Sequence, residues 1–118
     1  MKLFFKSFTY AWKGLLLCLK QRNMRVMMTC AVLAIALGFA LQIDLTDWCF
    51  ILLCIGGVLA LEAMNTAIES FVDLVQPELH PLAGRIKDIS AGAVFFFSII
   101  SAIVGALIFG KYILDLFL

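Results

Sequence analysis

Apolar residues fill three long stretches of this chain, separated by short polar segments. The first stretch covers residues 26–43 and contains no charged residue. The second begins at 48 but takes in polar residues after 61, so it reaches an ordinary span of about 20 residues only by continuing towards 75. The third covers residues 89–109. The pattern predicts an all-α integral membrane protein with transmembrane helices at 26–43, 48–75 and 89–109.

The N-terminal residues, 3–25, show the pattern of an amphipathic helix. Aromatic and leucine side chains share one broad side, whereas Lys6, Lys13 and Lys20 recur every seven residues on another. Such a helix lies in the headgroup region of an anionic leaflet, with its apolar side in the lipid. Packing against another protein surface is the alternative interpretation. We therefore predict a surface helix followed by three spans, all within a single domain of residues 1–118.

The composition and the placement of charge agree with a membrane protein. Of the 118 residues, 64% are hydrophobic and 14% are charged, which leaves too little polar surface for a soluble domain. Six of the nine basic residues lie in the first 25 positions, and the loop between the first two spans has none. The positive-inside rule then places the N-terminus and the second loop in the cytoplasm. We expect lipid, and no nucleic acid, as a partner.

The second apolar stretch carries a stripe of polar residues. At about 100° per residue, Glu62, Asn65, Thr66, Glu69 and Asp73 fall within one helix face about 100° wide. Holding a carboxylate at membrane depth costs about 2.5–3.5 kcal/mol or more. The stripe therefore indicates chemistry, or a bound cation, at the membrane boundary.

The two glutamates of the stripe lie at different depths. Glu62 and Glu69 are two turns apart, about 10.5 Å along the helix axis. A carboxylate can accept a hydroxyl proton, and another can hold Mg²⁺ on phosphate oxygens nearer the surface. Lys87 and Asp88 add a cation and an acid before the third span. No P-loop or kinase-type glycine loop is present, so a phosphate site here would be of another kind.

These side chains also have structural interpretations. Glu62 could pair with a cation on a neighbouring helix, although no Lys or Arg lies within any predicted span. Asn65 could simply join two helices, and Asp73 could be a solvated carboxylate near a helix end. Lys87 could bind a lipid phosphate, and Asp88 could cap the third helix.

Small residues at four-residue spacing predict where the helices touch. Gly56 and Ala60 have this spacing on the second span. On the third span the residues with this spacing are Ser98, Ala102, Ala106 and Gly110. Small side chains let helix backbones approach closely in lipid.

The polar residues resemble the signature of the prokaryotic diacylglycerol kinase family, which includes the undecaprenol kinases. The chain has E-x-x-N-[ST]-A-I-E-x-x-x-D from Glu62 to Asp73, then Pro-Glu-Leu-His-Pro at 77–81 and Lys87-Asp88. The similarity covers essentially the whole chain, and the two prolines are closer to the undecaprenol kinase branch. The resemblance implies a homotrimer of the bacterial inner membrane. It would transfer the γ-phosphate of ATP to a lipid alcohol, diacylglycerol or undecaprenol, with Mg²⁺.

The resemblance also implies roles for individual residues. Glu62 is then the catalytic base, and Glu69 is a metal ligand. Ser7, Trp12, Glu62 and Asn65 would contact the lipid substrate. The residues around ATP would be Tyr10, Glu69, Glu78, His80, Lys87 and Asp88. From the residues alone, His80 could equally be an ordinary loop residue.

One metal-binding position departs from the family. A second glutamate usually precedes an Asn-x-Arg segment at the start of the first span, and Gln21 stands there in this chain. An amide oxygen can ligate Mg²⁺ but brings no negative charge, so we expect weaker metal binding. The family's histidine shortly after that arginine is also absent, with Met27 and Met28 in the region.

A non-enzymatic oligomer with a carboxylate-lined cation path is the rival interpretation. Glu62 and Glu69 would then line a pore. The sequence favours the kinase, because a pore requires neither the Lys87-Asp88 segment nor a basic surface helix.

Overall fold

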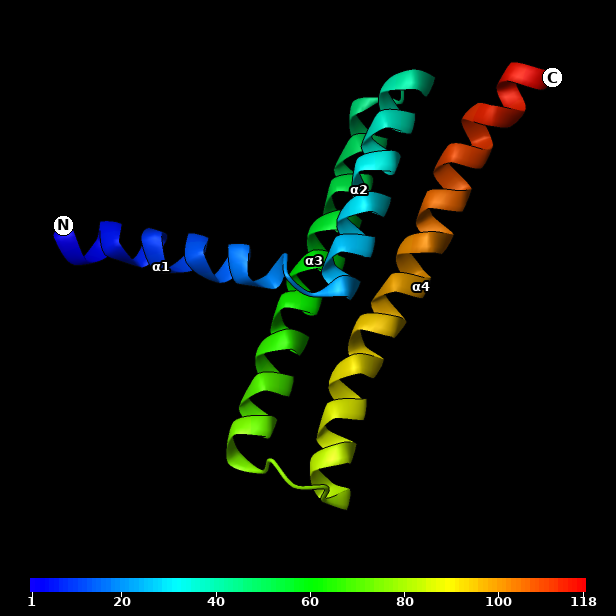
Figure 1. The fold of residues 1–118 in the computed structure, drawn as a ribbon. Helices are drawn as coiled ribbons and strands as arrows, with labels where there is room; N and C mark the ends of the chain where they lie inside the picture. Colours follow the sequence, from blue (N-terminus) through cyan, green and yellow to red (C-terminus); the bar gives the residue numbers. More distant parts are fainter.

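The computed structural model describes residues 1–118 and contains four helices and no strand (Figure 1). The helices are α1 (Lys2–Cys18), α2 (Arg22–Leu41), α3 (Leu45–Val75) and α4 (Pro81–Phe117). By length and composition, α2, α3 and α4 can each cross a membrane. The predicted all-α fold with three membrane-spanning helices is therefore confirmed.

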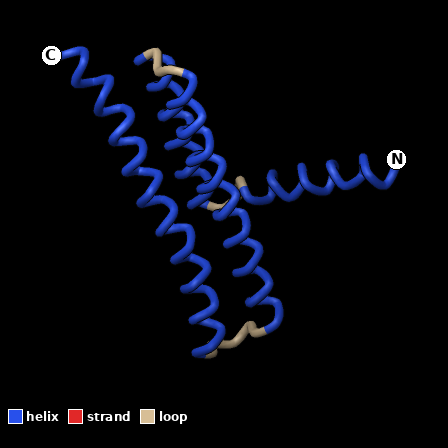
Figure 2. Tube along the Cα trace, turned by 180° about the vertical axis from the view of Figure 1, so that it is seen from behind, coloured by secondary structure: helices blue, strands red, loops and turns tan.

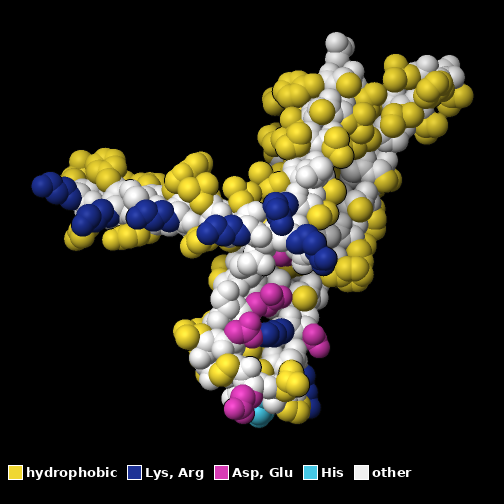
Figure 3. Space-filling view, viewed as in Figure 1, with side chains coloured by type: hydrophobic (Ala, Val, Ile, Leu, Met, Phe, Trp, Pro, Cys, Tyr) yellow, Lys and Arg dark blue, Asp and Glu magenta, His cyan; other side chains and the backbone are white.

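α1 runs away from the other helices, as Figures 1 and 2 show from opposite sides. No residue of α1 is buried, and basic side chains follow one another along it between hydrophobic ones (Figure 3). The helix ends at Cys18, earlier than the predicted 25, and α2 begins at Arg22 rather than at 26. The cause is the extended backbone of Gln21, with φ −77° and ψ 133°, which interrupts the helix and lets the chain turn.

The helices α3 and α4 are much longer than the membrane requires. Their 31 and 37 residues correspond to about 46 and 55 Å, against a hydrocarbon thickness of about 30 Å. The predicted third span, 89–109, is only the middle part of α4. In Figure 1 both helices continue past the level at which α1 leaves the bundle. If α1 lies at the membrane surface, as the sequence predicts, the end of the hairpin around residues 76–80 would lie outside the apolar layer.

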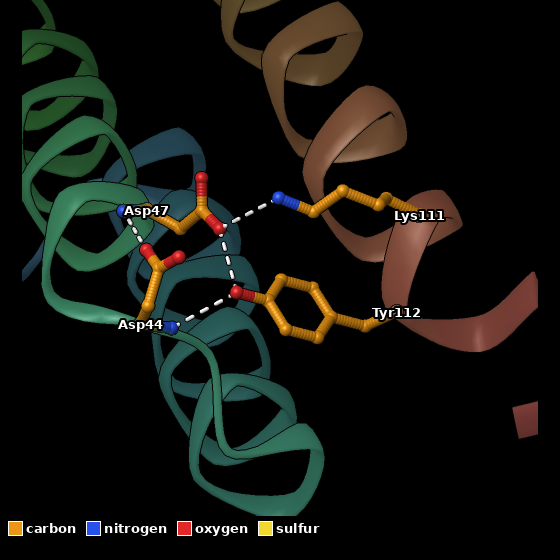
Figure 4. Close-up of polar contacts among 4 residues, drawn as sticks. All are labelled: Asp44, Asp47, Lys111 and Tyr112. Atoms are coloured by element: carbon orange, nitrogen blue, oxygen red, sulfur yellow. Dashed lines mark hydrogen bonds and ion pairs between the residues drawn. The ribbon is translucent and has the colours of Figure 1, made fainter. Parts of the chain in front are cut away.

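Polar contacts join α3 to α4 at the opposite end of the bundle (Figure 4). The Tyr112 hydroxyl donates to Asp47 Oδ2 at 2.7 Å and accepts from the backbone N–H of Asp44 at 2.9 Å. Lys111 Nζ lies 3.1 Å from the same Asp47 oxygen. Asp44 also caps α3, since its Oδ1 accepts from the Asp47 N–H. These contacts fasten the first turn of α3 to the last turns of α4.

The close approach of α3 to α4 occurs at Gly57, next to the position predicted from the small-residue spacing. A Cβ atom at Gly57 would overlap the ring of Phe97, whereas one at Gly56 would meet nothing within 4 Å. Gly56 and Ala60 are both exposed. Within one chain this side of α3 faces outward, so a helix contact through Gly56 and Ala60 stays a prediction.

Gly57→Ala is expected to destabilise the protein by about 1–3 kcal/mol, because the added methyl group would displace the Phe97 ring from a packed contact. Gly92→Ala in α4 is the matched control, since a methyl group added there meets nothing within 4 Å. Denaturant unfolding of both variants in detergent micelles provides the measurement. Equal losses in the two variants would contradict this assignment of the contact.

Candidate functional site

The polar stripe of α3 goes from buried to exposed along the helix. Glu62 and Asn65 are 3% and 5% exposed, Glu69 is half-buried, and Asp73 is exposed. The residues follow one another at three or four positions, so the helix itself aligns them. The arrangement provides one carboxylate within apolar surroundings and another that soluble molecules can approach. This gradient agrees with the two depths predicted from the sequence.

Asn65 connects the stripe internally. Its Nδ2 donates a hydrogen bond of 3.1 Å to Glu69 Oε1. Its Oδ1 is buried and has no hydrogen-bond partner. A buried acceptor without a partner is costly, and a ligand hydroxyl that donates to it would remove that cost. Glu69 thus orients the Asn65 amide, which leaves an acceptor free one turn from Glu62.

A basic residue of α4 joins the exposed end of the stripe. Lys87 Nζ forms an ion pair with Asp73 Oδ1 across the α3–α4 hairpin. Figure 3 shows acidic side chains gathered with a basic one just beyond the point where α1 leaves the bundle. Asp73 is therefore paired with Lys87 and does not stand alone in solvent.

The N-terminal cap of α4 is His80. Its Nδ1 accepts from the Leu82 N–H at 3.1 Å, and Pro81 occupies the first helical position. Asp88 lies seven residues beyond Pro81, so the interpretation of Asp88 as a helix cap is wrong. Histidine is an uncommon capping residue, and the Pro at the start of the helix was the available signal.

A shallow pocket of about 220 Å³ lies between the end of α3 and the start of α4. Its lining includes the predicted ATP-binding residue His80, whereas Glu78 and Asp88 are exposed. The other lining residues are Phe71, Val72, Val75, Gln76, Leu82, Ala83 and Ile86. Of the predicted nucleotide residues, only His80 therefore lines this mostly apolar hollow.

The predicted site residues of α1 do not join the stripe within one chain. Ser7, Tyr10 and Trp12 are exposed, on a helix that runs away from α3 and α4 (Figure 1). The Ser7 hydroxyl donates to Leu3 O in its own helix at 3.1 Å. Gln21 is exposed at the start of α2. No group of three His, Cys, Asp or Glu side chains is placed to hold a metal ion.

These features define a class of protein. It is an α-helical membrane protein whose α3–α4 hairpin carries a carboxylate stripe and an ion-paired lysine. Comparison with known proteins gives its family. Residues 9–109 match the family model described as prokaryotic diacylglycerol kinase. The chain belongs to this family, as the signature in α3 predicted.

Individual relatives agree with this assignment. The undecaprenol kinase of Bacillus subtilis is 43% identical over 107 residues, which cover 90% of this chain and 87% of the relative. The diacylglycerol kinase of Helicobacter pylori strain 26695 is 31% identical over 118 residues, or 99% and 89% of the two chains. The diacylglycerol kinase of Escherichia coli K12 is 30% identical over 99 residues, or 83% and 81%.

The chain is thus a lipid kinase, a phosphotransferase that uses ATP, and it is a multi-pass membrane protein. The rival interpretation, a non-enzymatic cation path, is not favoured. Sequence reasoning missed the pairing of Lys87 with Asp73, because the spacing along one helix does not indicate which residue of another helix it meets.

Proposed function

We propose that this lipid kinase transfers the γ-phosphate of ATP to the hydroxyl group of undecaprenol. The observation that carries the proposal is Glu62, a carboxylate only 3% exposed, one turn from the free Asn65 Oδ1. A lipid alcohol brings its hydroxyl to such a site from the apolar side. The 43% identity to an undecaprenol kinase supports this alcohol, whereas the relatives named diacylglycerol kinases favour diacylglycerol as the second candidate.

Glu62 is the proposed catalytic base, which takes the proton as the hydroxyl oxygen attacks phosphorus. Asn65 orients the hydroxyl by accepting from it, and its own orientation is held by Glu69. Ser7 and Trp12, exposed on α1, contact the lipid. The deep end of the stripe is thereby assigned to the lipid alcohol, which accepts the phosphoryl group.

The nucleotide occupies the exposed end of the stripe in this proposal. Lys87 donates to phosphate oxygens as a compact cation. The remaining residues proposed to surround ATP are Tyr10, Glu69, Glu78, His80 and Asp88. The apolar hollow lined by His80 and Ile86 is the proposed binding place for the adenine ring of ATP.

Mg²⁺ is the proposed cofactor, and the donor groups of the chain suit it. Glu69 uses only Oε1 for its hydrogen bond to Asn65, so its second oxygen has no protein partner. Carboxylate and amide oxygens are ligands that hard divalent cations accept. Glu69 and Gln21 are the residues that would hold the ion, and a bound Mg²⁺ would offset the negative charge of the phosphates.

The proposed assembly is a homotrimer in the bacterial inner membrane, with the N-terminus in the cytoplasm. Within one chain, the α1 residues Ser7, Tyr10 and Trp12 lie away from the stripe (Figure 1). This separation supports an assembly in which α1 of one copy completes the site of another. The exposed Gly56 and Ala60 give α3 a face that another helix can approach. The basic residues of the first 25 positions support the orientation. Mass measurement of the detergent-solubilised protein tests the copy number.

The test of function is ATP-dependent transfer of γ-labelled phosphate into organic-extractable lipid by the purified protein. Undecaprenol and diacylglycerol are offered separately in mixed micelles, with micelles lacking either alcohol as the control. Faster labelling of undecaprenol is expected. Faster labelling of diacylglycerol would overturn the proposed acceptor and leave the kinase activity in place. Labelling of neither alcohol would overturn the proposed function.

Gln21→Glu is expected to lower the Mg²⁺ concentration that gives the half-maximal rate. A full negative charge would replace a dipole beside a hard divalent cation. The fold should tolerate the change, because Gln21 is exposed and its side chain makes no capping hydrogen bond. Rates across a Mg²⁺ series decide the matter, with Gln42→Glu at the other end of α2 as the control. Superimposable curves for Gln21→Glu and the unmodified protein would mean that residue 21 does not face the metal.

A further inference from the structure

The ion pair between Lys87 and Asp73 has no part yet in the proposed reaction. Asp73 lies in the last turn of α3 and Lys87 in the second turn of α4, so the pair spans the hairpin. The side chains are 37% exposed for Lys87 and 62% exposed for Asp73. A soluble nucleotide can therefore reach both.

Stability alone gives little reason for this contact. Exposed ion pairs contribute little to stability, because water screens them and two side chains lose freedom. The loop of residues 76–80 and the packing of the two helices already hold the hairpin together. The greater consequence is for Lys87 itself, because a free lysine side chain has many rotamers and loses much conformational entropy when it is held in one place.

The position of Asp73 determines where the lysine is held. Asp73 follows Glu69 by four residues, about 40° around the helix, so both carboxylates share the stripe. An ammonium bound to Asp73 is therefore kept on the side of α3 that carries Glu69 and Glu62. Without Asp73, the lysine could extend into solvent and would have to be recruited in each turnover.

We propose that Asp73 is a positioning residue for phosphoryl transfer. Its carboxylate holds the Lys87 ammonium beside the stripe, where the lysine meets the phosphates of the nucleotide. The inference rests on the proposed function and adds a residue that does not touch the reacting atoms. No bond to Asp73 forms or breaks, and Lys87 keeps its proton while its contact is shared between carboxylate and phosphate.

Asp73→Asn tests this role through kinetics. We expect kcat to fall about tenfold, because the lysine is no longer placed in advance, while the KM for ATP changes less than about twofold. In a Lys87→Ala background the same change should cause no further loss, as expected for residues that act as a unit. Asp115→Asn, an exposed aspartate near the end of α4, is the matched control and should behave as the unmodified protein.

Two kinetic outcomes would overturn the proposal. A lower KM with undiminished kcat in Asp73→Asn would mean that Asp73 only repels the nucleotide. Additive losses in the double variant would mean that Asp73 acts independently of Lys87.

A second readout does not depend on lipid phosphorylation. Modification of Lys87 by an amine-acylating reagent, followed by mass spectrometry, reports how readily this side chain leaves its contact with Asp73. Faster modification in Asp73→Asn than in the unmodified protein, without any lipid or ATP present, is expected. An unchanged rate would overturn the positioning role even if the kinase reaction is confirmed. Failure of all lipid labelling together with faster modification would count against the proposed function and not against the contact.

Discussion

Glu62→Gln is expected to abolish most turnover while ATP binding remains largely intact. General-base catalysis contributes about 10²–10⁴-fold, and an amide cannot take the proton of the lipid hydroxyl. We place the loss at the lower end, because positioning and charge stabilisation dominate phosphoryl transfer. ATP binding should persist, because Glu62 lies at the buried end of the stripe, two turns from Glu69.

The measurement for Glu62→Gln combines lipid phosphorylation in mixed micelles with direct nucleotide binding. The amide is nearly the same size as the carboxylate, so the packing around residue 62 should survive, and unfolding in micelles verifies this. Near-normal turnover in a folded variant would remove Glu62 from the role of base. The matched comparison is the same substitution at Glu69, for which the opposite signature is expected.

Glu69→Gln is expected to abolish metal-dependent nucleotide binding. The substitution would leave two amides, at residues 21 and 69, as the proposed ligands, with no negative charge between them. Mg²⁺ prefers charged oxygen ligands. The Mg²⁺ concentration required for nucleotide binding should therefore rise far above the one that the unmodified protein needs. The hydrogen bond from Asn65 can be kept, because the new amide still offers an oxygen.

A Mg²⁺ titration at fixed ATP, read by nucleotide binding, checks the result for Glu69→Gln. Asp115→Asn again serves as the control for loss of one acidic charge at a distance from the site. An unchanged Mg²⁺ dependence would mean that the ion is held elsewhere, for example by the phosphates alone. The two glutamate variants together therefore separate proton transfer from metal binding on a single helix.

The order of the helices and the content of the stripe were predictable because both depend on local spacing. Three apolar stretches must become helices in lipid, where each backbone polar group needs an internal partner. Once α3 is a helix, the intervals of three and four residues place Glu62, Asn65 and Glu69 on one face. The family signature lies within this same segment, so the sequence was sufficient to indicate a lipid kinase.

The boundary between α1 and α2 and the end of α4 were less predictable, because no local signal marks them. Neither Gly nor Pro occurs at residues 19–21, so the turn between α1 and α2 had no visible breaker. At the other end of the chain, Lys111 and Tyr112 lie beyond the predicted third span, yet α4 continues through them. Their contacts with Asp47, distant in sequence, stabilise that continuation.

The sequence by itself thus determined the periodic features: which segments are apolar helices, and which polar residues share a face of α3. Only the tertiary structure decided the contacts between helices, because these depend on the rotation of one helix against another. That rotation places Gly57, and not Gly56, against Phe97. It also brings Lys87 to Asp73, a pairing for which the spacing along either helix contains no information.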